Sequence, residues 1–225
     1  MTIPVLGIAY ISQPGLFREL IGSIDHPIDR LVIIDNSPEG DAPAPPGSIH
    51  VATRHNLGVS ASWNLVIKSN PLAPWWAIVN SDMEFGPGDL ERLSGMVQPG
   101  PAVYHLDGFA AFAVTPDVIA RVGLFDENFV PAYYEDNDYH RRCGLLGVPT
   151  EQVPNGMTHV RSAVLKGSQH YQDENRRTFP MNADYYRRKW GGLPGQETFS
   201  TPFDRGGSPA QWEFDHARLA ELTWR

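Results

Sequence analysis

The chain has 225 residues, of which 41% are hydrophobic and 11% aromatic; this composition excludes wholesale disorder and suffices for one sizeable α/β domain. Its formal net charge of −8 argues against nucleic acid as a partner, because surfaces that grip a duplex usually carry a basic patch. The lone cysteine, Cys143, cannot form an internal disulfide. No apolar run approaches the about 20 residues that cross a bilayer. We therefore expect a soluble, cytoplasmic protein with no membrane span.

The first half of the chain alternates short apolar segments with helical patterns. Strands are predicted at residues 4–12, 30–35, 49–53 and 75–79, and helices at about 14–24 and 59–69. Strands that are apolar on both faces and alternate with helices are typical of a mostly parallel sheet covered on each side. Four prolines within residues 37–48 exclude regular structure there. The predicted fold class is therefore α/β.

The second half follows a different pattern, with strands predicted in mixed directions. The strands are expected at residues 102–106, 109–114 and 150–153, and the helices at 116–122, 133–146, about 171–177 and about 210–222. We see no internal repeat and no low-complexity tract. The pattern predicts one domain, with a nucleotide-binding first half and a variable second half.

Polar clusters stand at the carboxyl ends of three predicted strands: Tyr10-Ile11-Ser12, Asp35-Asn36-Ser37 and Asn80-Ser81-Asp82. In open parallel sheets, ligands bind beyond these ends. Asp35 could accept a hydrogen bond from a pyrimidine N–H, and Asp82 could bind a hard cation. The same residue types also form turns and caps, which is the alternative for any single cluster. Three clusters at one edge favour a ligand site.

A diphosphate ligand calls for a divalent cation, Mn²⁺ or Mg²⁺, to screen its charge. Such ions take one or two carboxylates plus phosphate oxygens, and Mn²⁺ tolerates imidazole. Asp82 supplies one such ligand, and His159, after a predicted strand and a Pro-Asn-Gly turn, could supply another. The alternative is that His159 is a structural histidine.

The densest group of acidic residues is Tyr133-Tyr134-Glu135-Asp136-Asn137-Asp138, at the start of a predicted helix. Carboxylates in a first helical turn suit the helix dipole, which is a purely structural interpretation. In the functional interpretation one carboxylate is a general base that takes the proton of an acceptor hydroxyl. The neighbouring aromatic side chains of Phe129, Tyr133 and Tyr134 suit stacking on a sugar face.

Several segments resemble the inverting glycosyltransferases of family 2, which have the GT-A fold. The most specific segment is Asn56-Leu57-Gly58-Val59-Ser60-Ala61-Ser62-Trp63-Asn64, which is similar to the family's N-x-G-x-small-x-small-x-N pattern. Gly123-Leu124-Phe125-Asp126-Glu127 resembles its G-x-F-D-E lead-in, and Glu135-Asp136 its acidic pair. The resemblance runs from about residue 5 to residue 192 and is strongest to rhamnosyltransferase-like and galactofuranosyltransferase-like members.

The resemblance implies roles for individual residues. Asp136 would be the general base beside Glu135, and Asp82 and His159 would be the metal ligands. Residues that would bind the nucleotide are Tyr10, Asp35, Asn56, Gly58, Asn64, Asn80 and Ser81. Residues that would bind the acceptor are Gly108, Phe109, Tyr133 and Tyr134.

The chain departs from the family at its Asp-x-Asp motif. Asn80-Ser81-Asp82 retains only the second aspartate, the usual metal ligand, so Asn80 could contribute only a neutral oxygen. Within the single domain, 1–225, we expect a nucleotide-sugar-binding half at about 1–106, an acceptor and catalytic half at about 107–192, and a tail at 193–225.

The expected reaction is one displacement, with inversion, that moves a sugar from a UDP- or dTDP-sugar to a hydroxyl acceptor. Its central requirement is a single cleft that gathers Asp35, Asp82, Asp136 and His159. One alternative is a sugar-1-phosphate nucleotidyltransferase, although the first basic residue after the first strand is Arg18 rather than part of a Gly-rich loop. The other alternative is a non-catalytic, carbohydrate-binding relative.

Overall fold

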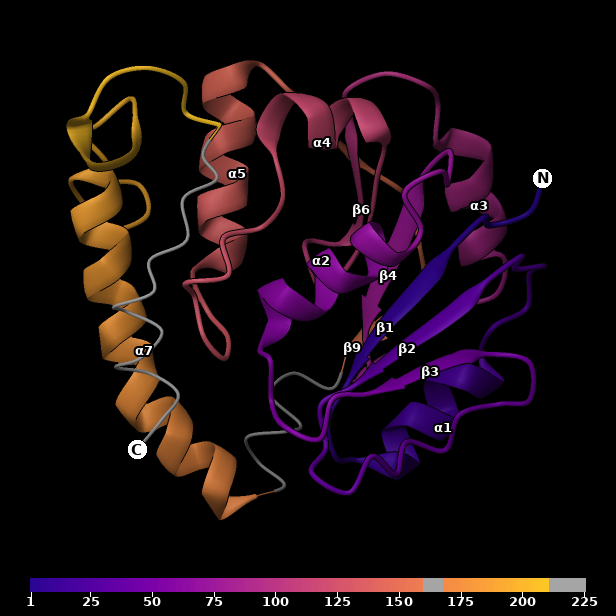
Figure 1. Cartoon of the computed structure of the whole chain (residues 1–225). Helices are drawn as coiled ribbons and strands as arrows, with labels where there is room; N and C mark the ends of the chain where they lie inside the picture. Colours follow the sequence, from indigo (N-terminus) through magenta and orange to yellow (C-terminus); the bar gives the residue numbers. More distant parts are fainter. Residues whose placement is uncertain (160–167, 211–225) are drawn as a thin grey trace.

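The computed structural model of the protein describes residues 1–159 and 168–210. Within these ranges the main sheet has seven strands in the order β3-β2-β1-β4-β7-β6-β8 (Figure 1). They are β1 (Leu6–Tyr10), β2 (Leu31–Asp35), β3 (Ile49–Ala52), β4 (Trp76–Asn80), β6 (Val103–Asp107), β7 (Ala111–Val114) and β8 (Thr150–Gln152).

The mostly parallel sheet that the sequence predicts is confirmed. Strands β3, β2, β1 and β4 are parallel neighbours, and β6 pairs with β8 in parallel. Strand β7 is the exception, because it is antiparallel to both β4 and β6. Strands β4 and β6 therefore run in the same direction, so their carboxyl ends lie at the same edge of the sheet.

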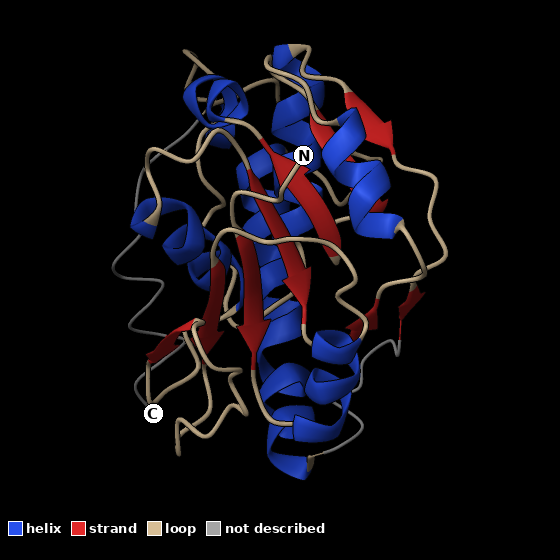
Figure 2. Cartoon of the chain, turned by 90° about the vertical axis from the view of Figure 1, so that its right-hand side faces the viewer, coloured by secondary structure: helices blue, strands red, loops and turns tan. Residues whose placement is uncertain are grey.

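Helices cover both faces of the sheet (Figure 2). Successive side chains of a strand point to opposite faces. In β2, Ile33 packs in the core with α1 (Pro14–Gly22) and α3 (Asp89–Met96). Its neighbours Val32 and Ile34 pack in the other core. That second core contains α2 (Val59–Ser69), α4 (Pro116–Val122) and α5 (Glu135–Leu146). The sequence pattern located α2 to the residue but missed α3.

The long helix α7 (Gln169–Trp190) forms one outer edge of the molecule (Figure 1). It is much longer than the helix expected at 171–177, and it continues through Pro180. Its last turns pack Tyr185, Tyr186 and Trp190 against Phe129. The short helix η1 (Pro202–Asp204) follows, and nearly all of the helix expected at 210–222 lies outside the described residues. No helix within residues 1–159 and 168–210 combines the length and hydrophobicity needed to cross a bilayer.

A second sheet, of two strands, brings His159 close to Asp82. Strand β5 (Met83–Glu84) pairs antiparallel with β9 (Thr158–His159), and Met83 lies opposite His159. Because β5 directly follows Asp82, this pairing brings a histidine from 77 positions later in the chain back to the end of β4.

Candidate active site

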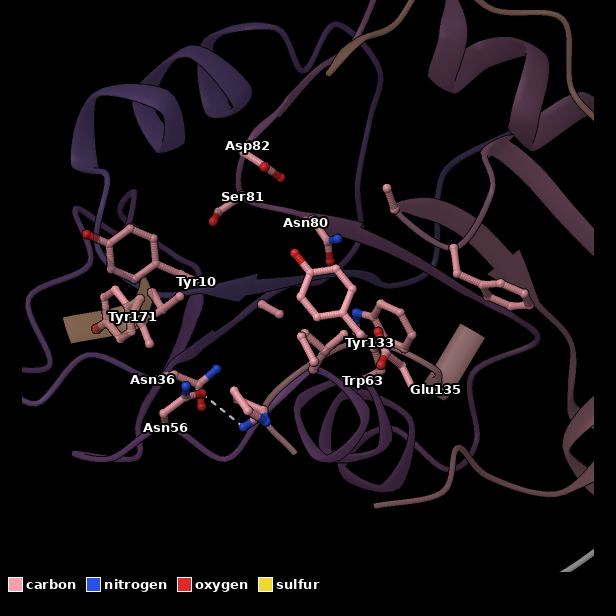
Figure 3. A pocket seen from close by; sticks show the side chains of 18 of the residues that line it. Tyr10, Asn36, Asn56, Trp63, Asn80, Ser81, Asp82, Tyr133, Glu135 and Tyr171 are labelled. Carbon is pink, nitrogen blue, oxygen red and sulfur yellow. Dashed lines mark hydrogen bonds between the residues drawn. The ribbon is translucent and has the colours of Figure 1, made fainter. Parts of the chain in front are cut away.

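A pocket of about 530 Å³ opens at the carboxyl ends of β1, β2 and β4. Figure 3 shows Tyr10, Tyr171, Asn36 and Asn56 on one side, Ser81 and Asp82 at the top, and Tyr133, Trp63 and Glu135 on the other side. Most of the residues predicted from the sequence line it: Tyr10, Asn56, Gly58, Asn80, Ser81, Asp82, Phe109, Tyr133, Glu135, Asp136 and His159. The expected position of a ligand at this sheet edge therefore coincides with a cavity.

Asp82 and His159 form a pair that could hold a divalent cation. The His159 Nε2 atom lies 3.6 Å from Asp82 Oδ2, and both side chains are mostly buried. On the opposite side of the ring, His159 Nδ1 is 2.7 Å from the carboxylate of Asp107, at the end of β6. A carboxylate only accepts hydrogen bonds, so Nδ1 carries the proton and donates it. The lone pair of Nε2 is thereby left for the side of the ring that faces Asp82.

The donor set fits an ion that is shared with a diphosphate. Among the described residues, no group of three or more His, Cys, Asp or Glu side chains could hold a metal by itself. Mg²⁺ is usually bound by one or two carboxylates together with substrate phosphates, and Mn²⁺ accepts imidazole as well. Asp82 and His159 therefore suit an ion that takes its remaining ligands from the substrate.

The acidic pair at the start of α5 lies on the other side of the pocket. Burial raises the pKa of Glu135 to about 8, and the neighbouring charge of Asp136 adds to the effect. Burial also raises the pKa of Asp136 above its usual value, although the backbone N–H of Asn137 donates to its carboxylate at 2.7 Å. A base whose pKa is moved toward neutrality is a better proton acceptor than an ordinary aspartate.

The loop before α5 has a strained backbone. Tyr133 and Tyr134 have φ angles of 78° and 74°, a left-handed conformation that is costly for non-glycine residues. The buried side chain of Asn182 holds this loop from α7, because its amide donates to the carbonyls of Val130, Ala132 and Tyr133. Helix α7 thus fixes the segment that carries the acidic pair.

Gly58, in the most specific motif, allows close packing at the start of α2, and its neighbour there is the loop that contains Pro131. Its φ angle is 83°, and a Cβ atom there would lie 2.8 Å from the carbonyl oxygen of Pro131. The next residue, Val59, donates its N–H to that same oxygen at 2.7 Å. Only glycine lets the start of α2 meet the loop that precedes Glu135.

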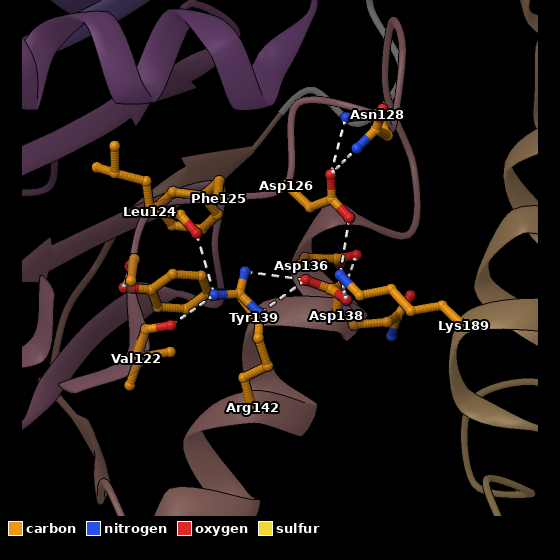
Figure 4. A network of polar contacts seen from close by, with 12 residues as sticks. Val122, Leu124, Phe125, Asp126, Asn128, Asp136, Asp138, Tyr139, Arg142 and Lys189 are labelled. Atoms are coloured by element: carbon orange, nitrogen blue, oxygen red, sulfur yellow. Dashed lines mark hydrogen bonds and ion pairs between the residues drawn. The ribbon is translucent and has the colours of Figure 1, made fainter. Parts of the chain in front are cut away.

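A buried ionic network joins α5 to α7 and to the segment before α5 (Figure 4). Lys189 of α7 is fully buried, and its Nζ lies 2.7 Å from Asp126 and 2.6 Å from Asp138. Asp138 also pairs with the buried guanidinium of Arg142 at 2.9 Å. Burial alone would raise the pKa of Asp126, but the ammonium of Lys189 holds it below the usual value. The network therefore balances two cations with two carboxylates. One of the carboxylates, Asp138, lies two residues after Asp136 in the chain.

Helix α7 also supplies part of the pocket wall, which sequence reasoning missed. Tyr171, Glu174 and Asn175 line the cavity. The Asn56 amide donates to Glu174 at 3.4 Å, and the Ser12 hydroxyl to Tyr171 at 3.4 Å. A polar helix distant in sequence carries no local signal of this contact, so only the tertiary structure could reveal it.

Comparison with known proteins found a relative in sequence. The chain is 54% identical over 124 residues to a protein of Leishmania donovani named galactofuranosyl glycosyltransferase. The match covers 54% of this chain and 27% of that protein, so the chain spans about a quarter of its relative's length. No family model matches the chain.

Solved structures with the same fold include the catalytic domain of Drosophila beta1,4galactosyltransferase 7 in complex with xylobiose. The TM-score is 0.55 at 8% identity, over 75% of this chain and 74% of that one. The chain has the GT-A fold of glycosyltransferases. A mutant of the same Drosophila enzyme, in complex with manganese, UDP-Gal and xylobiose, aligns with a TM-score of 0.52 at 7% identity, over 93% and 84% of the two chains. The predicted resemblance to GT-A glycosyltransferases is confirmed.

One expectation about this GT-A site needs correction, because Asp35 does not line the pocket. The side chain is fully buried, and its carboxylate accepts hydrogen bonds from the backbone and hydroxyl of Ser37, from the Ala42 N–H and from His50. Burial alone would raise its pKa, but these hydrogen bonds lower it. Asp35 therefore fixes the loop after β2, and of the four residues expected in one cleft the structure brings together Asp82, Asp136 and His159.

Three further predicted site residues also lie outside the pocket lining. Asn64 is buried and bonds the backbone of Phe125 through both of its amide atoms, which ties α2 to the segment before α5. Gly108 is exposed in the turn between β6 and β7. Tyr134 packs against Phe179 and Tyr186 of α7. Each of the three has a packing or turn role that its residue type did not reveal.

Proposed function

We propose that this protein is an inverting glycosyltransferase that moves a sugar from a UDP- or dTDP-sugar to a hydroxyl acceptor. The observation that carries the proposal is the single pocket that joins the Asp82–His159 pair to the Glu135–Asp136 pair. One pair suits a metal-bound diphosphate, and the other suits a hydroxyl that must lose its proton.

The comparisons support the class of donor. The similar Drosophila structure contains manganese and UDP-Gal, and the Leishmania relative is named a galactofuranosyl glycosyltransferase. In this chain, Asp82 and His159 would hold the cation, and Tyr10, Asn36 and Asn56 line the side of the pocket that we assign to the nucleoside. When bound, the cation would supply positive charge against the departing diphosphate.

The reaction is a single displacement. The acceptor oxygen forms a bond to the anomeric carbon, the bond from that carbon to the diphosphate oxygen breaks, and Asp136 receives the acceptor proton. The nucleoside diphosphate leaves with the bonding electron pair. Because the sugar is transferred once, its anomeric configuration inverts.

The first test uses a panel of UDP- and dTDP-sugars with Mn²⁺ or Mg²⁺, and measures the nucleoside diphosphate released with and without saccharide acceptors. Asp136→Asn should bind the preferred donor normally and turn over at least about 10²-fold more slowly, because it lacks the base. Normal turnover by this variant would remove Asp136 from the mechanism. Release from none of the donors would contradict the proposed activity.

The second test separates the metal from the base. Asp82→Ala should weaken binding of UDP in the presence of Mn²⁺ and leave metal-free UDP binding unchanged, as measured by calorimetry. Asp136→Asn is the matched control, since it removes a carboxylate charge from the same pocket without removing a metal ligand. Equal Mn²⁺-dependent binding by both variants would contradict the assignment of Asp82.

A further inference from the structure

Two buried polar atoms in the pocket wall have no hydrogen-bond partner among the described residues. They are the indole Nε1 of Trp63 and the carboxyl Oε2 of Glu135. Both side chains are more than nine-tenths buried, with exposed fractions of 2% and 6%. Burying such an atom without a partner costs about 1–3 kcal/mol, so the pair calls for a functional explanation.

The Trp63 ring is held in a fixed direction. It contacts Phe112 and Phe125 edge-on, at centroid distances of 5.1 and 4.8 Å, and Phe109 at 6.5 Å. Its N–H therefore cannot turn toward another acceptor without disturbing this aromatic core. By contrast, the equally buried Trp76 donates its N–H to the carbonyl of Asn70 at 3.0 Å.

The chemistry of the two atoms defines the group that could satisfy both. An indole N–H only donates, and the carboxyl oxygen of Glu135 can accept. A hydroxyl can accept from the indole and donate to the carboxyl group in either protonation state of Glu135, whereas an ammonium cannot accept from the indole. Figure 3 shows Trp63 and Glu135 at the same end of the pocket, away from Tyr10, Asn36 and Asn56. This is the end that carries Asp136, rather than the end we assign to the nucleoside.

We propose that Trp63 and Glu135 form a recognition site for a sugar hydroxyl, which accepts from the indole N–H and donates to the carboxyl group. This inference rests on the proposed function and deepens it. It assigns a recognition role to Trp63, which occupies a variable position of the Asn56–Asn64 motif. Tyr133 is half-buried and lines the same pocket as this pair. The hydroxyl belongs either to the acceptor or to the sugar of the donor.

The indole N–H of Trp63 provides a direct probe. The chain has six tryptophans, and in the ¹⁵N-labelled protein the Trp63 indole signal is identified by its loss in Trp63→Phe. Four separate titrations use UDP with Mg²⁺, UDP-galactose with Mg²⁺, methyl β-galactofuranoside, and methyl α-rhamnoside. A new hydrogen bond moves the Trp63 signal downfield. Movement with a methyl glycoside identifies an acceptor hydroxyl, and movement with UDP-galactose but not with UDP identifies a donor hydroxyl.

Matched variants complete the test. Trp63→Phe should weaken binding of the active sugar about tenfold, which corresponds to one lost hydrogen bond to a carboxyl-linked hydroxyl. Trp76→Phe removes an indole N–H from the same core and should leave sugar binding unchanged. Both variants should bind UDP with Mg²⁺ like the wild type. Should Trp63→Phe fail to fold, the titrations of the wild-type protein still decide the question.

Failure of this inference is distinguishable from failure of the proposed function. If the wild type binds UDP but the Trp63 signal stays still in every titration, or moves as much with UDP as with the sugars, the hydroxyl site is refuted and the enzyme proposal stands. If the wild type binds no nucleotide and releases diphosphate from no donor, the proposed function itself fails.

Discussion

Replacing Lys189 by methionine should test how firmly the acidic helix is held. The Lys189 ammonium is completely buried, 2.7 Å from Asp126 and 2.6 Å from Asp138. Methionine preserves most of the apolar stem but leaves two buried carboxylates to a single cation, Arg142. Breaking a buried pair in this way costs about 3–5 kcal/mol, because one charge stays uncompensated. We expect the free energy of unfolding to fall by that amount.

Lys68→Met is a matched control for this prediction. Lys68 pairs with Glu127 at a similar distance, 2.9 Å, but its side chain is 53% exposed. The two substitutions change the net charge equally, so they differ in burial of the pair. Surface pairs contribute about 0–1 kcal/mol, and Lys68→Met should cost no more than that. Urea unfolding followed by circular dichroism measures both values through the midpoint and the slope.

Two further measurements identify the cause as charge. Adding Asp126→Asn to Lys189→Met restores the balance of charges and should recover part of the lost stability. In the wild type, burial alone would raise the pKa of Asp126, but Lys189 holds it below 3.8, so this stabilisation is present above pH 3.8 and is lost as the pH falls through the folded value. The deficit of Lys189→Met should therefore shrink in acid. A loss equal to that of Lys68→Met, or a double variant no more stable than the single one, would refute the reasoning.

Three other predictions follow from the pocket. Asp107→Asn no longer fixes the proton on His159 Nδ1, so Mn²⁺ affinity in the presence of UDP should fall about 10–100-fold by calorimetry; unchanged affinity would show that Asp107 has no such role. Glu135 has a pKa raised from 4.5 to about 8, so between those values the folded protein keeps a proton that the unfolded chain releases. Stability should therefore fall as the pH rises through this window, by up to about 1.4 kcal/mol per pH unit, and Glu135→Gln should remove that slope in urea unfolding; an identical slope would contradict it. Trp63→Phe should cost about 1 kcal/mol less stability than Trp76→Phe, because only Trp76 loses a hydrogen bond, and equal losses in thermal or urea unfolding would count against an unpartnered Trp63.

The sequence determined the architecture because the signals for its elements are local. Apolar runs with turn residues at their ends located β1, β2 and β4 within about two residues at most boundaries, and helical periodicity located α2 (Val59–Ser69). Parallel strands place their carboxyl ends at one edge, so the clusters after β1 and β4 could be expected to share a cavity, and they do. Helix α3 was missed, although Asp89 and Glu91 in its first turn suit a helix N-terminus.

The tertiary structure alone decided which polar side chains face the pocket. Asp35 and Asp82 both stand at the ends of apolar strands. The loop after β2 folds back and donates hydrogen bonds to the carboxylate of Asp35, whereas the pairing of β5 with β9 brings His159 beside Asp82. Contacts from α7, such as Lys189 on Asp126 and Glu174 beside Asn56, join residues more than 60 positions apart. Residue type and spacing set which groups are available for chemistry, whereas hydrogen bonding among distant segments sets which of them are left to meet a ligand, and that competition has no local signature.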